Sequence, residues 1–279
     1  MATTAFFAPR TGDNKTYGDY LLNGVMLKVN QVNAAGGVNG RPIEITVYDD
    51  QCSAQESASV AQIIVDEPKY VAAVGSFNTP CVLAAATVFD EAQMVEMVPC
   101  AGADTVHKDH KYTFRQQNTN TTEFTYIGEV AVNDLKAEKV AMIYIQNDSG
   151  IIARDTVTAT VERLGKEVVI AEGVMPDQIS DYSAVLTKIR AADPDVITLT
   201  CNANAAATII KQSKLLGMED VLWLSTGTIY TDEFLEVGGE AVEGVYTMTT
   251  YFAGNTDPRI AAWTQAYLEA YDGATPNYF

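Results

Sequence analysis

Residues 23–50 read NGVMLKVNQVNAAGGVNGRPIEITVYDD, which predicts a helix, a turn and a strand in succession. From Asn23 to Asn33 the apolar residues recur at a spacing compatible with one side of a helix. The glycines at 36, 37 and 40 end that helix, because glycine adopts left-handed backbone geometry without steric cost. Residues 43–48 then alternate apolar and polar side chains. This alternation predicts a strand with one buried face, ending at the acidic pair Asp49-Asp50.

The stretch from Tyr17-Gly18-Asp19 to Asp49-Asp50, with its GGVNG turn, resembles the solute receptors of the leucine/isoleucine/valine-binding family. Members of that family are extracytoplasmic proteins that deliver solutes to ABC importers. The resemblance extends over nearly the whole chain. It implies the type 1 periplasmic binding protein fold, an α/β architecture of two Rossmann-like lobes with parallel sheets joined by a hinge. It also implies an exported protein, periplasmic or extracellular and associated with the cell surface.

Composition agrees with a folded two-lobe protein and excludes other classes. At 279 residues the chain is long enough for two cores. No run of 18 apolar residues occurs, so we expect no membrane insertion. The net charge of −18 argues against a nucleic-acid partner, because phosphate binding needs a basic surface. The opening residues carry no basic or apolar region, so we expect any signal peptide to lie outside this sequence.

Strand and helix patterns alternate along the rest of the chain, which predicts βαβ units and parallel sheets. Strands are expected at 5–8, 70–74, 94–98, 140–144, 168–174, 196–200 and 221–224. Helices are expected at 53–65, 80–92, 121–135, 151–164, 182–191, 205–216 and 257–272, the aromatic residues of the last helix packing into a core.

Two crossings divide this series into lobes. The polar segment 114–120 is expected to leave lobe 1, and 247–252 to return to it. Lobe 1 is then 1–117 plus 252–279, and lobe 2 is 118–251. The resemblance implies further elements beyond residue 279, so we expect the C-terminal part of lobe 1 to be incomplete. A chain truncated in this way should expose apolar surface and could self-associate.

Ligands of open parallel sheets bind beyond the carboxyl ends of the strands, which draws attention to the loop 75–81. Pro80 suits the first helical position, so Thr79 is expected at the helix cap. The N–H groups of a helix start suit a carboxylate. The resemblance assigns ligand binding to Thr79, which is compatible with plain capping. Ser76 and Asn78 of the same loop are further candidates.

The loop after the next strand is the second candidate in lobe 1. The resemblance implies that backbone groups of Cys100 and Ala101 bind the solute. Gly102 falls where the family has a hydroxyl residue and cannot supply that hydrogen bond. Compensation by Asp104 or Thr105 remains an open alternative. Near the N-terminus, Tyr17 corresponds to an aromatic residue that lines the family's cleft, with a packing tyrosine as the alternative.

Lobe 2 departs from the family pattern at three positions. Ser149 stands where an aromatic residue is common, and Asn202 where a tyrosine is common. Gly227 stands where amino-acid binders place an acidic residue against the ligand's ammonium group, although Asp232 is near in sequence. Burying an ammonium group without an opposing charge costs roughly several kcal/mol. We therefore expect a carboxylate, an aromatic acid or a neutral metabolite as ligand, rather than a standard amino acid.

The four cysteines give two further expectations. The resemblance implies a disulfide between Cys52 and Cys81, because the family often carries one near these places in lobe 1. Cys100 and Cys201 are expected at the cleft, where a catalytic thiol would need a histidine base. The sequence has two histidines, His107 and His110, in a loop rich in lysine and aspartate. We therefore expect no enzyme activity, no cofactor and no metal site.

These observations predict an extracytoplasmic solute-binding receptor for an ABC importer of the branched-chain amino acid type. Its partners would be a small molecule and the permease subunits. The alternative in the same fold is a ligand-sensing input domain of a regulatory or signalling system.

Overall fold

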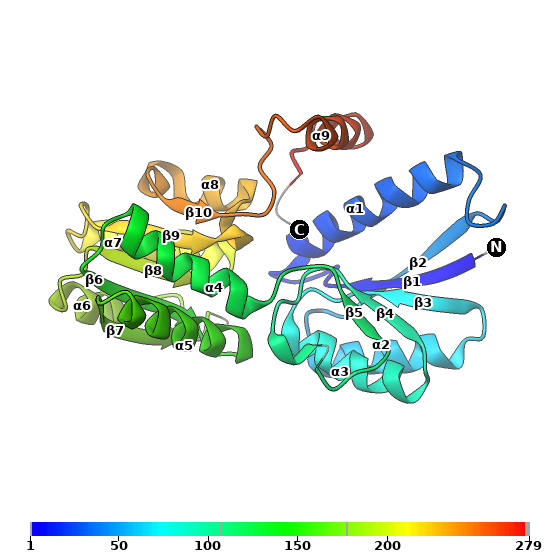
Figure 1. Ribbon diagram of the computed structural model, residues 1–279, viewed down its shortest axis with the longest axis horizontal. Helices are drawn as coiled ribbons and strands as arrows, with labels where there is room; N and C mark the ends of the chain where they lie inside the picture. The colour runs from blue at the N-terminus through cyan, green and yellow to red at the C-terminus, as the bar shows by residue number, and fades with distance from the viewer. Residues whose placement is uncertain (1, 107, 177, 277–279) are drawn as a thin grey trace. The chain divides into compact units, whose positions relative to one another are not determined.

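The computed structural model describes residues 2–106, 108–176 and 178–276. The chain folds into two compact units (Figure 1). Of the described residues, 2–118 and 253–276 form the first unit, and the second runs from Thr119 to Phe252. Each unit contains a five-stranded sheet in which the paired strands are parallel. The predicted architecture of two α/β lobes with parallel sheets is therefore confirmed.

In the first unit the strand order is β2-β1-β3-β4-β5. Its elements are β1 (Ala2–Ala8), α1 (Lys15–Ala34), β2 (Ile43–Asp49), α2 (Ala54–Asp66), β3 (Tyr70–Val74), α3 (Thr79–Glu91), β4 (Val95–Val98), the 3-10 helix η1 (Asp104–Val106), β5 (Thr113–Arg115) and α9 (Pro258–Ala270).

In the second unit the order is β10-β9-β8-β6-β7, which is the same arrangement when it is read from the other edge. Its elements are α4 (Asn120–Glu129), the π-helix η2 (Val130–Asp134), β6 (Lys139–Ile145), α5 (Asp148–Arg163), β7 (Glu167–Val174), α6 (Ser183–Ala191), β8 (Val196–Thr200), α7 (Ala203–Leu215), β9 (Leu222–Thr226), η3 (Gly227–Ile229), α8 (Asp232–Gly238), η4 (Gly239–Val242) and β10 (Tyr246–Met248).

The helix–turn–strand stretch at 23–50 forms largely as expected. Helix α1 ends at Ala34, and the three glycines that follow have φ angles of 104°, 73° and 77°, the left-handed region that the turn requires. The prediction of one buried face on β2 was wrong. Tyr48 packs against the core on one side of the sheet and Ile45 against the core on the other, while Val47 is exposed.

The two faces of the first sheet are covered differently. Ala5, Phe7 and Ala73 pack in a core with residues of α2 and α3. On the opposite face, Phe6 packs against Leu21 of α1. The parallel register places Phe6, Val74, Met97 and Phe114 in one row on this α1 side. Exposure rises along the row to 40% at Met97 and 50% at Phe114, so the α1 face of β4 and β5 stays uncovered.

The central strands of the second sheet are buried on both faces. All residues from Val140 to Tyr144 of β6 are buried, as are those from Val196 to Leu199 of β8. Leu224 of β9 packs with Phe124 and Val157 in the core formed with α4 and α5. The central strands of the second sheet therefore form a hydrophobic layer, as expected of parallel strands between helices.

Each unit carries one of the two tryptophans. Trp223 is buried in β9, and Trp263 is half-buried on α9. The aromatic residues of α9 pack together as predicted, with ring centroids 5.5 Å apart for Trp263 and Tyr267. The Tyr271 hydroxyl donates a hydrogen bond to the Asn23 carbonyl oxygen at 2.6 Å, which ties the C-terminal helix segment to α1.

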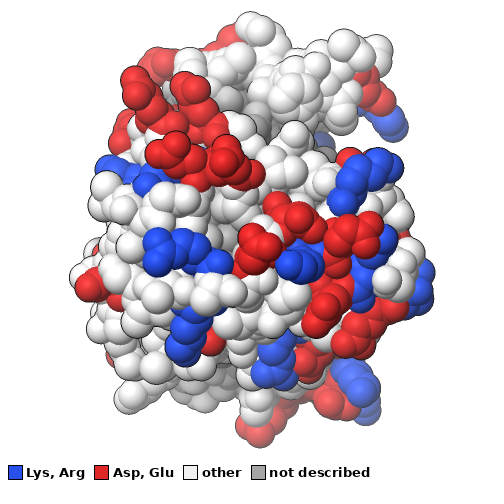
Figure 2. Space-filling model, turned by 90° about the vertical axis from the view of Figure 1, so that its left-hand side faces the viewer, with Lys and Arg blue, Asp and Glu red and all other residues white. Residues whose placement is uncertain are grey.

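The helices of the described part of the chain are each too short or too polar to cross a bilayer. Acidic and basic side chains are mixed over the face viewed in Figure 2, and one group of acidic side chains gathers near its upper edge. Charged groups on the surface keep their hydration, which accommodates the strongly negative net charge.

Several short elements were not predicted. Phe114 and Arg115 belong to β5, although the polar segment around them was expected to be an extended crossing. Helix α8 and strand β10 were also missed. Elements of three to seven residues carry too few periodic positions to be recognised from the sequence pattern alone.

Candidate functional site

The loop after β3 is fixed by a buried acid. Ser76 is fully buried, and its hydroxyl donates a hydrogen bond to the Asp50 carboxylate. The same carboxylate accepts from the Ser57 hydroxyl at 2.8 Å and from the Cys52 N–H at 3.0 Å. The structure thus places Ser76, a predicted site residue, in a hydrogen-bond network around Asp50, which sequence reasoning had not assigned to the site.

Asn78 rather than Thr79 caps α3. The Asn78 Oδ1 accepts the N–H of Cys81 at 3.1 Å, and the helix begins at Thr79 with Pro80 in its second position. The predicted cap was therefore wrong by one residue. Asparagine and threonine both cap helices, and proline is accepted throughout the first turn, so the sequence did not distinguish the two. Thr79 itself is buried.

The expected Cys52–Cys81 disulfide is not present in the structure, in which neither residue is bridged. The Asn78 Nδ2 donates a hydrogen bond to the Cys52 sulfur at 2.8 Å. Cys81 is fully buried in the first turn of α3. The Asn78 amide, rather than Cys81, therefore lies against the Cys52 sulfur.

Tyr17 packs against the same loop. Its ring stacks on the ring of Phe77 with centroids 4.4 Å apart and planes 7° apart, and Tyr17 is buried. This buried, stacked geometry is the one expected of a tyrosine that packs in the interior, the alternative to a tyrosine that lines the cleft. Through Phe77, Tyr17 also supports the segment that carries Ser76 and Asn78.

The loop after β4 is linked to the loop after β3 by a thiol. Cys100 donates to the Phe77 carbonyl oxygen at 3.0 Å. Burial, and to a lesser degree the negative charge of Asp50, raises the pKa of the Cys100 thiol well above its usual range. The thiol therefore stays neutral and acts as a hydrogen-bond donor, which is the opposite of an activated nucleophile.

Arg115 holds the rest of that loop, a role that sequence reasoning missed. Its Nη1 donates to the carbonyl oxygens of Gly102 at 3.2 Å and Ala103 at 2.7 Å. Burial lowers the pKa of Arg115, and Asp104 partly opposes this shift. Because the C=O and N–H groups of a trans peptide point in opposite directions, the N–H groups of residues 103 and 104 face away from the guanidinium. Ala101 and Gly102 are both buried.

The candidates for compensating the missing hydroxyl at 102 lie at the start of η1. Asp104 is half-buried and Thr105 is exposed. The alternative between them stays open.

In the second unit, Ser149 lies in the first turn of α5, directly after the strand β6. Its hydroxyl accepts a hydrogen bond from the Asn120 Nδ2 at 2.6 Å. Asn147 caps the helix through its Oδ1, which accepts the Gly150 N–H at 2.9 Å. Ser149 is half-buried, so part of its side chain is accessible at this edge of the sheet.

Asn202 caps α7 through its Oδ1, which accepts the Ala205 N–H at 2.9 Å. The adjacent Cys201 is buried, and burial raises its pKa to about 12. Gly227 is buried at the start of η3, between Thr226 and Thr228, whose hydroxyl oxygens are 2.8 Å apart. The Thr228 hydroxyl also donates to the Cys201 carbonyl oxygen at 3.1 Å. Hydroxyls, rather than a carboxylate, flank position 227.

The predicted site residues therefore occupy corresponding places in the two sheets. Asn78 and Asn202 cap the helices that follow β3 and β8, and Gly102 and Gly227 lie in the loops that follow β4 and β9. In a parallel sheet these loops meet at the edge formed by the strands' carboxyl ends.

Of the two histidines, His107 lies outside the described residues. His110 lies 3.5 Å from Asp90, at the far end of β5 from the loop that carries Cys100. Within the described ranges no group of three or more His, Cys, Asp or Glu residues is arranged to hold a metal ion.

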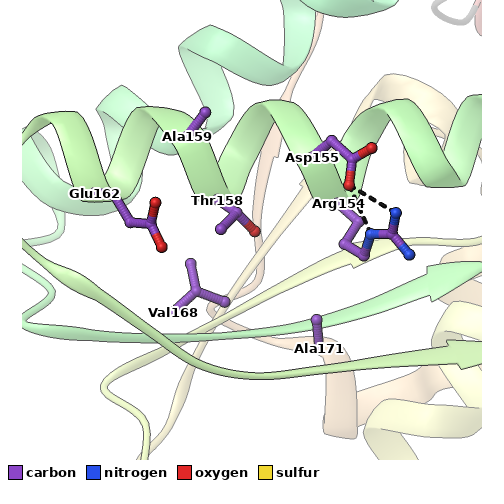
Figure 3. Close-up of a pocket in the computed structure, with 7 residues that line it drawn as sticks. All are labelled: Arg154, Asp155, Thr158, Ala159, Glu162, Val168 and Ala171. Atoms are coloured by element: carbon purple, nitrogen blue, oxygen red, sulfur yellow. Dashed lines mark hydrogen bonds and ion pairs between the residues drawn. The ribbon is translucent and has the colours of Figure 1, made fainter.

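A hollow of about 460 Å³ lies apart from these loops (Figure 3). It is lined by Arg154, Asp155, Thr158, Ala159 and Glu162 of α5 and by Val168 and Ala171 of β7. Arg154 and Asp155 form an ion pair of 2.7 Å along its rim. None of the predicted site residues lines it, because it faces the middle of α5 rather than the carboxyl ends of the strands.

Comparison with known proteins gives one family. The family model described as "Periplasmic binding protein" matches residues 3–279. The "Amino acid binding protein" of Pseudomonas aeruginosa is 29% identical over 266 residues, which cover 94% of this chain and 69% of the relative. Other curated relatives are covered to 66%, so the chain spans about two thirds of their length.

Solved structures show the same fold at lower identity. The substrate-binding protein LivJ of a branched-chain amino acid transporter from Streptococcus pneumoniae, in complex with isoleucine, has a TM-score of 0.92 at 23% identity, covering 100% of this chain and 79% of that protein. A solute-binding protein from Rhodopseudomonas palustris, in complex with 3,4-dihydroxybenzoic acid, has a TM-score of 0.87 at 22% identity, covering 99% and 76%.

Proposed function

Because this chain belongs to the periplasmic binding protein family, we propose that it captures a small solute for an ABC importer of the branched-chain amino acid type. The solute would be bound by the loops at the carboxyl ends of the strands and handed to permease subunits at the membrane. This role needs no bond to be made or broken. It fits the two buried thiols near these loops, Cys100 and Cys201, whose pKa values are raised.

The preferred ligand class follows from position 227. Gly227 provides no carboxylate, and hydroxyl groups of Thr226 and Thr228 flank it. An α-ammonium group buried there would lose its hydration without gaining a counter-charge. We propose that the solute is a carboxylate without an α-ammonium group, with aromatic acids as the leading class.

The two compared structures bracket this choice, since one holds isoleucine and the other 3,4-dihydroxybenzoic acid. A thermal-shift and calorimetric series tests it with these two compounds, benzoate and leucine. Ligand at a hundredfold excess over its Kd stabilises the native state by about 2.7 kcal/mol, which raises the Tm. The proposal expects that rise with the aromatic acids. Tighter binding of leucine or isoleucine than of any aromatic acid would contradict it.

A gain-of-function pair sharpens the test. Gly227→Glu restores an acidic side chain at the position in question, and Gly227→Gln adds the same volume without charge. We expect the glutamate variant alone to gain affinity for isoleucine, with both variants losing affinity for benzoate. Equal isoleucine affinity in the two variants would show that charge at this position does not select the ligand.

A further inference from the structure

Asp49 is the last residue of β2 and Asp50 follows it directly, and the two carboxylates hold different parts of the chain. Asp49 accepts the Arg10 N–H at 2.8 Å and the Thr11 hydroxyl at 2.7 Å, close to the surface. Asp50 is fully buried and reaches the loop after β3 through Ser76. The pair therefore supports two neighbouring loops from one strand end.

Every residue from 76 to 78 is restrained by a side chain from another element. Ser76 is bonded to Asp50, and the Phe77 ring is stacked on Tyr17. The Phe77 carbonyl accepts from Cys100, and the Asn78 amide donates to Cys52. Loops are usually the mobile parts of a fold, so restraint on three consecutive residues from α1, the β2–α2 turn and the β4 loop is unusual.

We propose that Asp50 is a positioning residue of the solute site, fixing the segment 75–78 in the conformation that receives the ligand. The inference rests on the proposed function, because it assumes that this segment contacts the solute. A loop ordered before binding loses less conformational entropy when the ligand arrives, which strengthens affinity without a direct contact.

The direction of the Ser76 hydrogen bond adds a consequence for recognition. The Ser76 hydroxyl donates to the Asp50 side-chain oxygen, so it directs its proton at Asp50. That proton is then unavailable to a solute carboxylate. The donors left for the ligand at this loop are then the Thr79 hydroxyl and the backbone N–H groups at the start of α3.

Ser57 provides a matched control for Ser76. Both hydroxyls donate to the same Asp50 oxygen, but Ser57 lies in α2 and Ser76 lies in the loop. We expect Ser57→Ala and Ser76→Ala to lower the Tm by similar amounts. Only Ser76→Ala and Asp50→Asn should weaken binding of 3,4-dihydroxybenzoate, by about tenfold, the loss that one well-placed hydrogen bond to a charged group gives. Asp49→Asn should leave the affinity within about twofold.

Two results would overturn the assignment. One is an equal loss of affinity in Ser57→Ala and Ser76→Ala, which would mean that stability alone sets binding. The other concerns the double variant Asp50→Asn with Ser76→Ala. If its loss of binding free energy equals the sum of the two single losses, rather than the loss of either single variant, the two residues do not act together. If Asp50→Asn does not fold, the two serine variants carry the test.

A measurement without ligand separates this inference from the proposed function. Hydrogen–deuterium exchange of residues 75–81 should accelerate in Ser76→Ala and stay unchanged in Ser57→Ala. If the wild type binds neither 3,4-dihydroxybenzoate nor isoleucine, the proposed ligand class fails while the exchange data still decide whether Asp50 orders the loop. Unchanged exchange in Ser76→Ala would show that Asp50 does not order it.

Discussion

Strand β4 of the first unit alternates between exposed and buried residues, whereas its counterpart β9 in the second unit is largely buried on both faces. The two strands hold the same place in sheets of the same order. In the first unit α2 and α3 cover one face, and α1 packs on part of the other (Figure 1). The comparison teaches that strand order and helical cover are separate properties, because a sheet forms its ladder without needing both faces covered.

The largest effect is expected from two substitutions that shorten a side chain, one in β9 and one in β4. Leu224 of β9 is 1% exposed, and Leu224→Ala should lower the free energy of unfolding by about 4 kcal/mol through lost burial and a cavity. Met97→Ala in β4 removes a side chain of similar size from the uncovered face and should cost less than about 1 kcal/mol. Urea denaturation measures both. Equal losses would show that the Met97 face is covered in solution, by self-association for example, and sedimentation at several concentrations would identify that case.

A second test uses a feature that the two units share. Gly18 in α1 and Gly150 in α5 lie in first helical turns against backbone carbonyls, and an added Cβ would come within 1.8 Å of the Pro9 and Ile145 oxygens respectively. Gly18→Ala and Gly150→Ala should each destabilise by about 3 kcal/mol because backbone must move. Gly24→Ala, in the same α1 helix with open space around it, should stabilise by about 0.5–1 kcal/mol. A neutral Gly150→Ala would mean that α5 shifts freely against β6.

A third test concerns Glu96, a buried acid in β4. The corresponding strand of the second sheet, β9, contains no acidic residue. The pKa of Glu96 is raised to about 8. Burial is the main cause and the charge of Asp90 adds to it, while the hydrogen bond from Thr113 partly opposes the shift. With a folded pKa above the unfolded value, the contribution to stability is complete below about pH 4.5 and disappears as the pH rises through 8. Glu96→Gln should remove this slope, making the variant more stable than wild type by about 2 kcal/mol at pH 6.5 relative to pH 5. Parallel pH profiles for the two proteins would refute it.

The smallest effects are expected at the two equivalent helix caps. Asn78→Ala and Asn202→Ala each remove one side-chain hydrogen bond to a first-turn N–H and should cost about 1 kcal/mol. Thermal denaturation measures this. Asn78 also bonds Cys52, so its variant should be the more damaging of the two. A larger loss for Asn202→Ala would indicate that the second unit depends more on its cap than the contacts suggest.

Much of this fold was predictable, because strands 70–74 and 196–200 were placed at the bounds the structure has. Short continuous apolar runs between helical patterns specify parallel strands well. Exposed apolar surface in the first unit was expected, but its position on β4 was not predictable, since VEMV has the same character whether helices cover one side or two. Short elements such as β5 and α8 depend on their tertiary neighbours rather than on their own pattern.

The candidate site was predicted at the level of loops and less well at the level of atoms. The sequence pointed to 75–81, but the roles of Ser76, Asn78 and Thr79 depend on which side chain reaches which partner. Asp50 was noted as half of an acidic pair, and only its burial beside Ser57 and Ser76 indicates its role. Arg115 acts on a loop twelve residues earlier in the chain, a link that no local pattern reports.

The distribution of the tryptophans gives a practical consequence for spectroscopy. Trp223 lies in an apolar interior and should emit at short wavelength, while the half-buried Trp263 should emit further to the red. Replacing either tryptophan by phenylalanine leaves a chain with a single tryptophan, placed in a known unit, which can be excited selectively over the tyrosines. Emission scans during unfolding would then follow each half of the molecule on its own, and a difference in midpoints would show whether the halves melt together.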